Sequence, residues 1–340
     1  MKPKHLYLPT SVSICTILLL CAASSLTQAA SYDHPEGRDE SDINAKHPAY
    51  RNCCQGIPTQ LMIYFPLVRN NYPISEAGKV VFASYRDNND DIYSMNSDGS
   101  GVTRLTTDPS TDNAPDWSPD GSQIVFDSNR SGLFEIYVMN SDGSNQHQVT
   151  TNGDCFSPEW SPDGSRIAFT RDAPGGTVIM TMNPDGSGQF QVTDPSLNAD
   201  SPQWSPNGTK ITFFGLLTNY GIYAVNTDGS NPVPLYLYNY IGSYAWSPDG
   251  IYLALSLASP PNYNWDIYLY TLGSGALVRL SNTKLNHLTI NWSPEGHQMI
   301  FSSNQDDLYN FEIYTMGIYG GQFTNLTNSP SPEISPDWTK

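Results

Sequence analysis

The chain has 340 residues, and its 33 acidic residues outnumber its 16 lysines and arginines, which gives a formal net charge of −17 at pH 7. Affinity for nucleic acid comes largely from basic side chains that neutralise phosphates. This composition therefore disfavours nucleic acid as a partner.

Residues 1–30 have the pattern of a secretory signal peptide. Two lysines precede an apolar stretch at residues 12–23, and a pair of alanines ends the segment. The apolar stretch is too short for a comfortable membrane span. We therefore expect a secreted or periplasmic protein of the cell envelope without a transmembrane segment. Cys21 leaves a lipoprotein as the alternative, although Leu20 is a poor residue before a lipid-modified cysteine.

Residues 31–78 are expected to be a linker of two parts. Its beginning is polar and charged and is predicted to be disordered, whereas residues 57–68 are apolar. This apolar segment either lies against the outside of the domain that follows or docks a partner. Isolated exposed apolar runs are uncommon on soluble monomers, which favours the first interpretation.

Three cysteines remain after removal of a signal peptide: Cys53, Cys54 and Cys155. An odd number in an oxidising compartment leaves at least one unpaired or bonded between chains. Adjacent cysteines pair with each other only under strain, so a bridge from one of them to Cys155 is the reachable option. The spacing does not fit a zinc site.

Residues 79–340 repeat a hexapeptide that is centred on tryptophan and resembles Asp-Trp-Ser-Pro-Asp-Gly. The copies recur about every 42 to 46 residues, the last one truncated by the end of the chain. The tryptophans are Trp117, Trp160, Trp204, Trp246, Trp292 and Trp338. This period, filled with short strands and turns, is typical of a β-propeller in which each repeat is one four-stranded blade.

Each repeat contains four short apolar runs, which we name strands A to D. Strand A carries the tryptophan, and in the second repeat strands B, C and D are predicted at residues 123–126, 135–140 and 148–150. The runs are rich in β-branched and aromatic residues and are bounded by Gly, Pro, Asn and Asp. An all-β fold is therefore predicted.

The first and last repeats are incomplete in complementary ways. The first begins at residues 79–82, which align with strand B, and residues 335–340 provide the missing strand A. We predict that the C-terminal strand joins the N-terminal blade and closes a ring of six blades. An open arc would instead leave unpaired strand edges.

The recurring modules Trp-Ser-Pro-Asp-Gly, Ile-Tyr-x-Met-Asn and Asn-x-Asp-Gly-Ser resemble the WD40-like (PD40) repeats of the TolB propeller family, over residues 79–340. The resemblance implies a six-bladed propeller. TolB itself carries a sizeable α/β domain before its propeller, whereas here only residues 31–78 separate the signal peptide from the first strand.

Because neighbouring strands are antiparallel, the A–B and C–D turns share one face of the ring, and the B–C and D–A loops share the other. Four C–D turns contain Asp-Gly, which suits the positive φ of tight hairpins. They lack the Asp-x-Asp-x-Asp-Gly series of a calcium loop, so we interpret them as turns. The B–C and D–A loops vary from repeat to repeat, and we expect the function there.

Charged residues on the variable face form the first candidate site. Three arginines follow strand B: Arg86, Arg130 and Arg171. If they turn inward, they ring one side of the channel mouth and grip a ligand carboxylate. Alternatively, they pair with Asp87, Asp108 or Asp172. Asp112 and Asp200, in predicted D–A loops, join the candidate binding residues.

Aromatic residues of the fourth and fifth repeats form the second candidate site. Tyr240, Tyr263 and Trp265 fall in predicted loops, where exposed rings stack on a sugar or on a peptide proline, or simply pack the loops. His287, in a predicted D–A loop, is added to the candidate binding residues.

Enzyme signatures are weak in this chain. There is no Gly-x-Ser-x-Gly elbow, and His147, His287 and His297 fall on a D strand, a D–A loop and an A–B turn, too far apart for one metal ion. We therefore expect a monomeric, non-catalytic propeller that binds a protein, peptide or glycan without a cofactor. The alternative is a calcium-dependent lyase or hydrolase of acidic carbohydrate, with a carboxylate-only calcium site.

Overall fold

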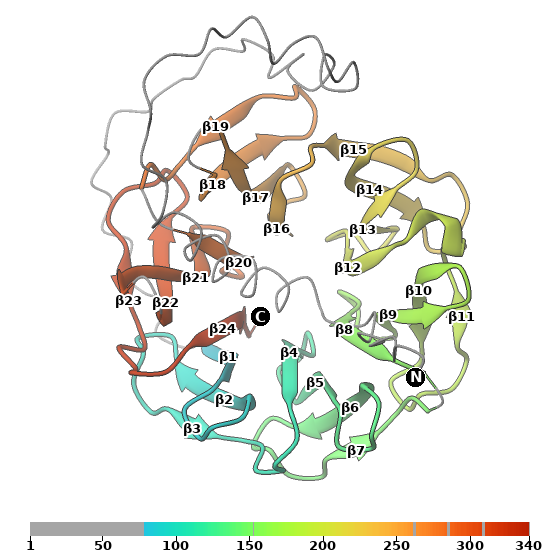
Figure 1. Cartoon of the computed structure of the whole chain (residues 1–340), viewed down its shortest axis with the longest axis horizontal. Coiled ribbons are helices and arrows are strands. Elements are labelled where there is room, and N and C mark those ends of the chain that lie inside the picture. The colour runs from blue at the N-terminus through green and yellow to red at the C-terminus, as the bar shows by residue number, and fades with distance from the viewer. Residues whose placement is uncertain (1–77, 152, 261–262, 284–285, 308–309, 340) are drawn as a thin grey trace, which may run out of the picture. The chain divides into compact units, whose positions relative to one another are not determined.

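The computed structural model describes residues 78–339 except residues 152, 261–262, 284–285 and 308–309. The expected signal peptide and nearly all of the linker, with its apolar segment 57–68, lie outside the described residues. The described part forms six four-stranded antiparallel sheets around one axis (Figure 1). The predicted six-bladed, all-β propeller is therefore confirmed.

Each sheet is one blade, and its strands run from A at the axis to D at the rim. Blade 1 contains β24 (Glu333–Trp338), β1 (Lys79–Ser84), β2 (Asp91–Asn96) and β3 (Thr103–Arg104); blade 2 contains β4 (Asp112–Trp117), β5 (Gln123–Ser128), β6 (Glu135–Asn140) and β7 (His147–Gln148); blade 3 contains β8 (Cys155–Trp160), β9 (Ile167–Ala173), β10 (Gly176–Met182) and β11 (Phe190–Gln191). Blade 4 contains β12 (Asp200–Trp204), β13 (Lys210–Leu216), β14 (Tyr220–Asn226) and β15 (Val233–Leu237); blade 5 contains β16 (Ile241–Trp246), β17 (Tyr252–Ser259), β18 (Asn264–Thr271) and β19 (Leu277–Arg279); blade 6 contains β20 (His287–Trp292), β21 (Gln298–Asp307), β22 (Asn310–Gly317) and β23 (Thr324–Asn325). A short 3-10 helix, η3 (Pro195–Leu197), precedes blade 4.

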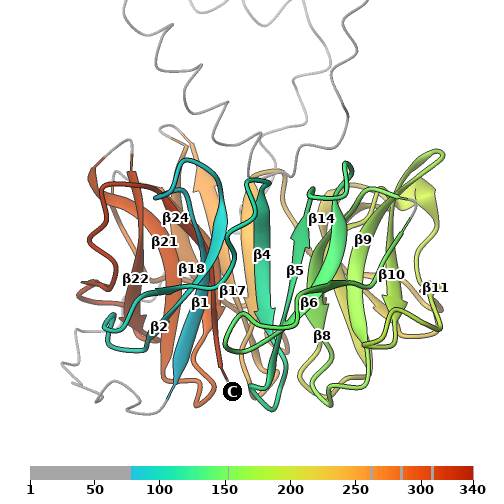
Figure 2. The same ribbon diagram turned by 90° about the horizontal axis from the view of Figure 1, so that it is seen from below.

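The two faces of the ring differ in their connections, as the sequence predicts. In Figure 2 the B–C and D–A loops lie along the upper edge, and the A–B and C–D turns lie along the lower edge with the C-terminus. We call the upper face the loop face and the lower face the turn face.

The ring closes where the last strand joins the first. β24 pairs antiparallel with β1, with Val80 opposite Trp338, and Thr339 N donates to Lys79 O at 2.9 Å. Trp338 is buried in a cluster that joins blade 1 to Ile300 and other residues of blade 6. The predicted closure by the C-terminal strand is therefore confirmed.

Apolar packing lies between blades rather than within them. The described residues form six buried clusters, and each combines side chains from two neighbouring blades. Because no blade can bury its faces alone, the blades are stable only as a ring.

Carboxylates link successive inner strands. The residue before one blade's tryptophan accepts the backbone N–H of the next blade's tryptophan. The pairs are Asp337 with Trp117 at 2.8 Å, Asp116 with Trp160 at 2.6 Å, and Glu159 with Trp204 at 3.1 Å. These acids of the repeated hexapeptide therefore serve the ring, and their number does not indicate a ligand site.

The buried indole N–H groups of the repeated tryptophans differ in whether they find a hydrogen-bond acceptor. Trp246 Nε1 donates to Thr212 Oγ1 of the preceding blade at 3.0 Å. The indole nitrogens of Trp117, Trp160, Trp204 and Trp338 are buried without a partner. The blades that precede Trp117, Trp160 and Trp204 carry valine or alanine at the position of Thr212, so no hydroxyl accepts these three indole N–H groups there.

Replacing Thr212 by valine should destabilise the protein, because it leaves the buried Trp246 N–H without an acceptor. We expect a loss of about 1–3 kcal/mol in the free energy of unfolding, measured by urea denaturation. Thr324→Val is the matched control on an exposed position of β23 and should change stability by less than about 0.5 kcal/mol. Equal stability of both variants would show that the hydroxyl does not support the indole.

Candidate functional site

The turn face is built from hydrogen-bonded turns. Asp142 Oδ1 accepts Ser144 N at 2.9 Å and Ser144 Oγ at 2.6 Å, and these bonds lower the pKa of Asp142. Gly143 has φ +83°, and a Cβ there would lie 2.7 Å from Leu105 O of the preceding blade. Asp98, Asp185 and Asp228 accept from a serine two residues later in the same way. These aspartates are turn residues, as interpreted from the sequence.

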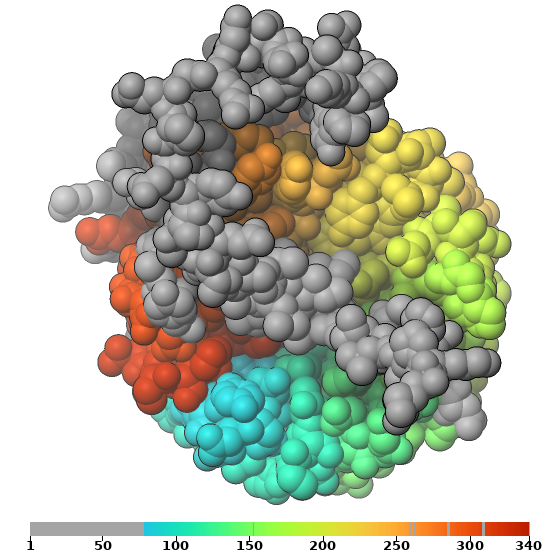
Figure 3. Space-filling model, in the orientation of Figure 1, coloured from blue at the N-terminus to red at the C-terminus, as the bar shows by residue number. Residues whose placement is uncertain are grey.

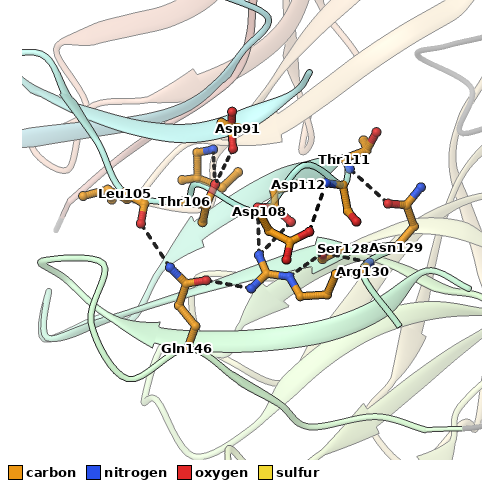
Figure 4. A network of polar contacts seen from close by, with 12 residues as sticks. Asp91, Leu105, Thr106, Asp108, Thr111, Asp112, Ser128, Asn129, Arg130 and Gln146 are labelled. Atoms are coloured by element: carbon orange, nitrogen blue, oxygen red, sulfur yellow. Dashed lines mark hydrogen bonds and ion pairs between the residues drawn. The ribbon is translucent and has the colours of Figure 1, made fainter. Parts of the chain in front are cut away.

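On the loop face, Arg130 lies inside its own blade. Its Nη2 atom contacts the two carboxylate oxygens of Asp112 at 2.8 and 2.9 Å, and its Nη1 atom donates to Gln146 Oε1 at 2.7 Å (Figure 4). The guanidinium also covers the ring of Tyr137, with 4.8 Å between the guanidinium carbon and the ring centroid. Asp112 is fully buried.

Arg86 repeats this arrangement in blade 1. It contacts Glu333 Oε1 at 2.6 Å, donates to Ser84 Oγ at 3.0 Å and covers the ring of Tyr93 at 4.8 Å. Glu333 is fully buried, and its burial raises the pKa of its carboxyl group. Of the two predicted alternatives, the structure shows ion pairing for Arg86 and Arg130.

The partners differ from those expected. Arg86 and Arg130 pair with the first residue of strand A in their own blades and not with Asp87, Asp108 or Asp172. Asp87 instead lies 3.2 Å from Arg104. Both arginines are thus engaged by carboxylates of their own blades, and a grip on a ligand carboxylate stays a prediction. Arg171, on β9, lies opposite Cys155 of β8 and forms no ion pair within the described residues.

His287 and Cys155 occupy the strand position that Asp112 and Glu333 hold in their blades. His287 is buried, contacts Thr283 Oγ1 at 2.8 Å and Ser303 Oγ at 2.9 Å, and its burial lowers its pKa to about 4. Cys155 is a buried free thiol, and its burial raises its pKa to about 12. Cys53 and Cys54 lie outside the described residues, so the suggested bridge to Cys155 stays a prediction.

Three predicted loop residues are strand residues. Asp112, Asp200 and His287 each begin a strand A, because the D–A connections end earlier than the sequence pattern suggests. Asp112 and His287 are buried in the ring and do not reach the surface. Asp200 as a whole residue is partly exposed. Its carboxyl group is shielded from water, which raises its pKa, and it accepts Thr170 Oγ1 at 3.1 Å.

Asp127 is a buried acid that the sequence analysis does not single out. Its Oδ2 atom accepts Ser157 N at 2.9 Å across the contact between blades 2 and 3, and Ser157 has φ +51° in a bulge of β8. Burial raises the pKa of Asp127 to about 7, and nearby Asp112 adds to the shift. Blades 1 and 3 carry Ala83 and Thr170 at this position, so an alignment of the repeats would have revealed the unusual acid.

The raised pKa of Asp127 makes stability pH-dependent. The unfolded chain releases this proton near pH 4, whereas the folded protein holds it to about pH 7, so the stability contribution present below pH 4 is lost as the pH rises through 7. The free energy of unfolding of Asp127→Asn, relative to that of the wild type, should therefore rise by about 1–3 kcal/mol from pH 4 to pH 8, measured by urea unfolding. Asp185→Asn, in an exposed turn, is the control without such a gain; parallel profiles for wild type and Asp127→Asn would contradict the buried proton.

Exposed apolar side chains gather on the loop face. Four B–C connections and one D–A connection carry one or two that are 43–53% exposed. They are Tyr85, Leu133, Leu216, Leu217, Tyr240 and Tyr263. The surfaces of blades 3 and 4, coloured from yellow-green to yellow, are in view on this face in Figure 3. The sequence analysis missed the leucines, because residues 213–217 continue an apolar strand pattern and the loop was expected to begin after them.

Tyrosines line the boundary between blades 4 and 5. The Tyr240 and Tyr263 rings lie 5.1 Å apart edge-on, and Tyr238 lies 5.9 Å from Tyr240. Tyr238 OH donates to Ala258 O at 3.0 Å, which fixes this row to blade 5. Tyr240 and Tyr263 lie in loops as predicted. Trp265 does not: it belongs to β18 and is partly buried.

Ligands for a metal ion do not converge in the described part of the chain, where no group of three or more His, Cys, Asp or Glu side chains is arranged to hold one. His147 is exposed on β7, and His287 is buried at the start of β20. Among the described residues, no helix is long and apolar enough to cross a membrane.

Comparison with known proteins agrees with this architecture. Residues 74–240 match the family model described as PD40, the TolB beta propeller domain. The chain carries a TolB-like propeller. No curated protein matches its sequence.

Solved structures share the fold of this TolB-like propeller at low sequence identity. TolB from Acinetobacter baumannii aligns with a TM-score of 0.69 and 19% identity, over 78% of this chain and 68% of that chain. A putative TolB from Agrobacterium tumefaciens aligns with 0.59 and 18%, over 77% and 98%. Oligogalacturonate lyase from Vibrio parahaemolyticus aligns with 0.51 and 12%, over 71% and 86%. At these identities the likeness shows the fold alone.

Proposed function

We propose that this TolB-like propeller is a secreted or periplasmic binding protein without catalytic activity that holds a protein or peptide on its loop face. The observation that carries the proposal is the contrast between the two faces. The turn face repeats one hydrogen-bonded turn in four blades and exposes three large apolar side chains, Val102, Ile251 and Tyr319, whereas the loop face exposes six on connections that differ between blades. Variable loops on a rigid scaffold are a common location of binding sites.

The composition of the loop face suits a protein ligand. Tyrosines are enriched in protein-binding surfaces, and the loop face exposes three tyrosines and three leucines. The described loops that carry Leu217 and Tyr240 are hydrogen-bonded to neighbouring strands, so little binding energy is lost in ordering them. A glycan remains the other candidate ligand, because Tyr240 and Tyr263 are exposed rings.

The second candidate function is calcium-dependent cleavage of an acidic carbohydrate. Its support is the fold shared with oligogalacturonate lyase and the acids near the loop face, where Asp154 and Asp200 help raise the pKa of Asp172. A surface of this charge repels an acidic substrate unless a cation intervenes. Turnover of oligogalacturonate that disappears on chelation would establish this function and overturn the binding proposal.

A pair of double variants tests the binding site. Tyr240→Ala with Tyr263→Ala should weaken binding of a partner captured by the full chain by about 1–3 kcal/mol, because exposed aromatic anchors dominate such interfaces. Affinities are measured with the purified partner by calorimetry, and the melting temperature should stay unchanged. The control is Val102→Ala with Tyr319→Ala, two exposed residues of the turn face. Loss of binding in the control alone would place the site on the turn face.

A further inference from the structure

We infer that the loop face over blades 3 to 5 recognises an extended segment of a partner protein in which apolar side chains stand next to lysines or arginines. The inference rests on the proposed function and specifies the chemistry of the partner. Two observations carry it: apolar side chains that are exposed on hydrogen-bonded loops, and carboxylates on adjoining connections of blade 3, where Asp172 N donates to Asp154 O at 2.9 Å.

The leucines are held outward by the hairpin between β13 and β14. Leu216 is 53% and Leu217 44% exposed. Tyr223 OH donates to Asn219 O and accepts Thr218 N at 3.3 Å, so the buried tyrosine anchors the tip of the hairpin. Apolar side chains that an ordered hairpin keeps in water are suited to fill apolar contacts of a partner without a large ordering cost.

Tyr240 and Tyr263 continue this surface toward blade 5. Ala258 N donates to Tyr240 O at 3.0 Å, which ties the D–A connection of blade 4 to β17. The two rings lie edge-on and are 43% and 47% exposed. Exposed tyrosine rings accept the stems and charged groups of lysine and arginine through cation–π contacts.

Carboxylates lie on the connections of blade 3, next to the leucines of blade 4. A Cβ on Gly176 would lie 2.5 Å from Pro195 O, and one on Gly215 would lie 3.3 Å from Leu197 O, so η3 lies beside both the β9–β10 hairpin and the end of β13. Burial raises the pKa of Asp172, and the charges of Asp154 and Asp200 raise it further. Asp194 is exposed at the start of η3, where it accepts Ser196 N at 2.9 Å. A cation placed among these carboxylates relieves their mutual repulsion. The charge of the surface therefore complements a basic ligand.

These features together select a protein segment over other ligands. Acidic peptides and acidic carbohydrates are repelled by the aspartates. Leu216 and Leu217 offer methyl groups and no hydrogen bonds, which suits apolar side chains better than sugar hydroxyls. A segment with both basic and apolar residues satisfies the two halves of the surface at once.

Three synthetic peptides test the inference on the full chain: one of alternating lysine and leucine, one with glutamate in place of lysine, and one with serine in place of leucine. Calorimetry should detect binding of the lysine–leucine peptide, with affinity falling as salt rises. Asp172→Asn with Asp194→Asn should weaken it about three- to tenfold. Leu216→Ser with Leu217→Ser should weaken it about tenfold. The control, Asp185→Asn with Asp228→Asn, removes the same charge from the turn face and should change nothing.

The possible results separate the two proposals. Equal binding of the glutamate–leucine peptide at the loop face, or no binding of any peptide, would overturn this inference. The proposed function would then still be tested by the binding of the captured partner to the Tyr240→Ala, Tyr263→Ala variant. Binding of the lysine–leucine peptide that responds only to the turn-face variant would overturn the inference and count against the loop face itself. Binding of the lysine–serine peptide as strong as that of the lysine–leucine peptide would also overturn the inference, because the apolar side chains would then contribute nothing.

Discussion

The pairing of β24 with β1 is the interaction on which the rest of the structure depends. It joins residues from the two ends of the described chain in one blade, and it brings Trp338 between blades 1 and 6. Because every apolar cluster is shared by two blades, a gap at this point would expose the sides of both neighbours to water. Closure therefore completes the last interface of the ring and removes the free inner edge of blade 1.

Closure also determines which side chains are left for function. The hexapeptide acids accept backbone N–H groups of the next blade, and Arg86 and Arg130 neutralise buried carboxylates. Breaking such a buried pair by removing one partner is costly, because it leaves an uncompensated charge. Polar residues near the axis thus hold the blades together, and the loop tips carry exposed side chains that can meet a partner.

The sequence predicted what depends on repetition. Period, strand order, ring closure and the Asp-Gly turns all follow from comparing one repeat with the next. Contacts between distant residues were beyond it: Glu333 lies 247 residues from Arg86, and nothing near either residue indicates the pair. His287 and Asp112 were assigned to loops because strand A begins with polar residues in several blades, and only the packing shows that these are buried. Leu216 and Leu217 were missed for the opposite reason, because apolar residues at the end of a strand pattern do not reveal exposure.

The most direct test of the central claim is site-specific photo-cross-linking in cells that produce the full chain. A photoreactive phenylalanine analogue replaces Leu217 on the loop face or Val102 on the turn face, both exposed in the ring. The account predicts a discrete cross-linked protein from position 217 that is absent or much weaker from position 102. A discrete cross-linked product from position 102, with none from position 217, would contradict it.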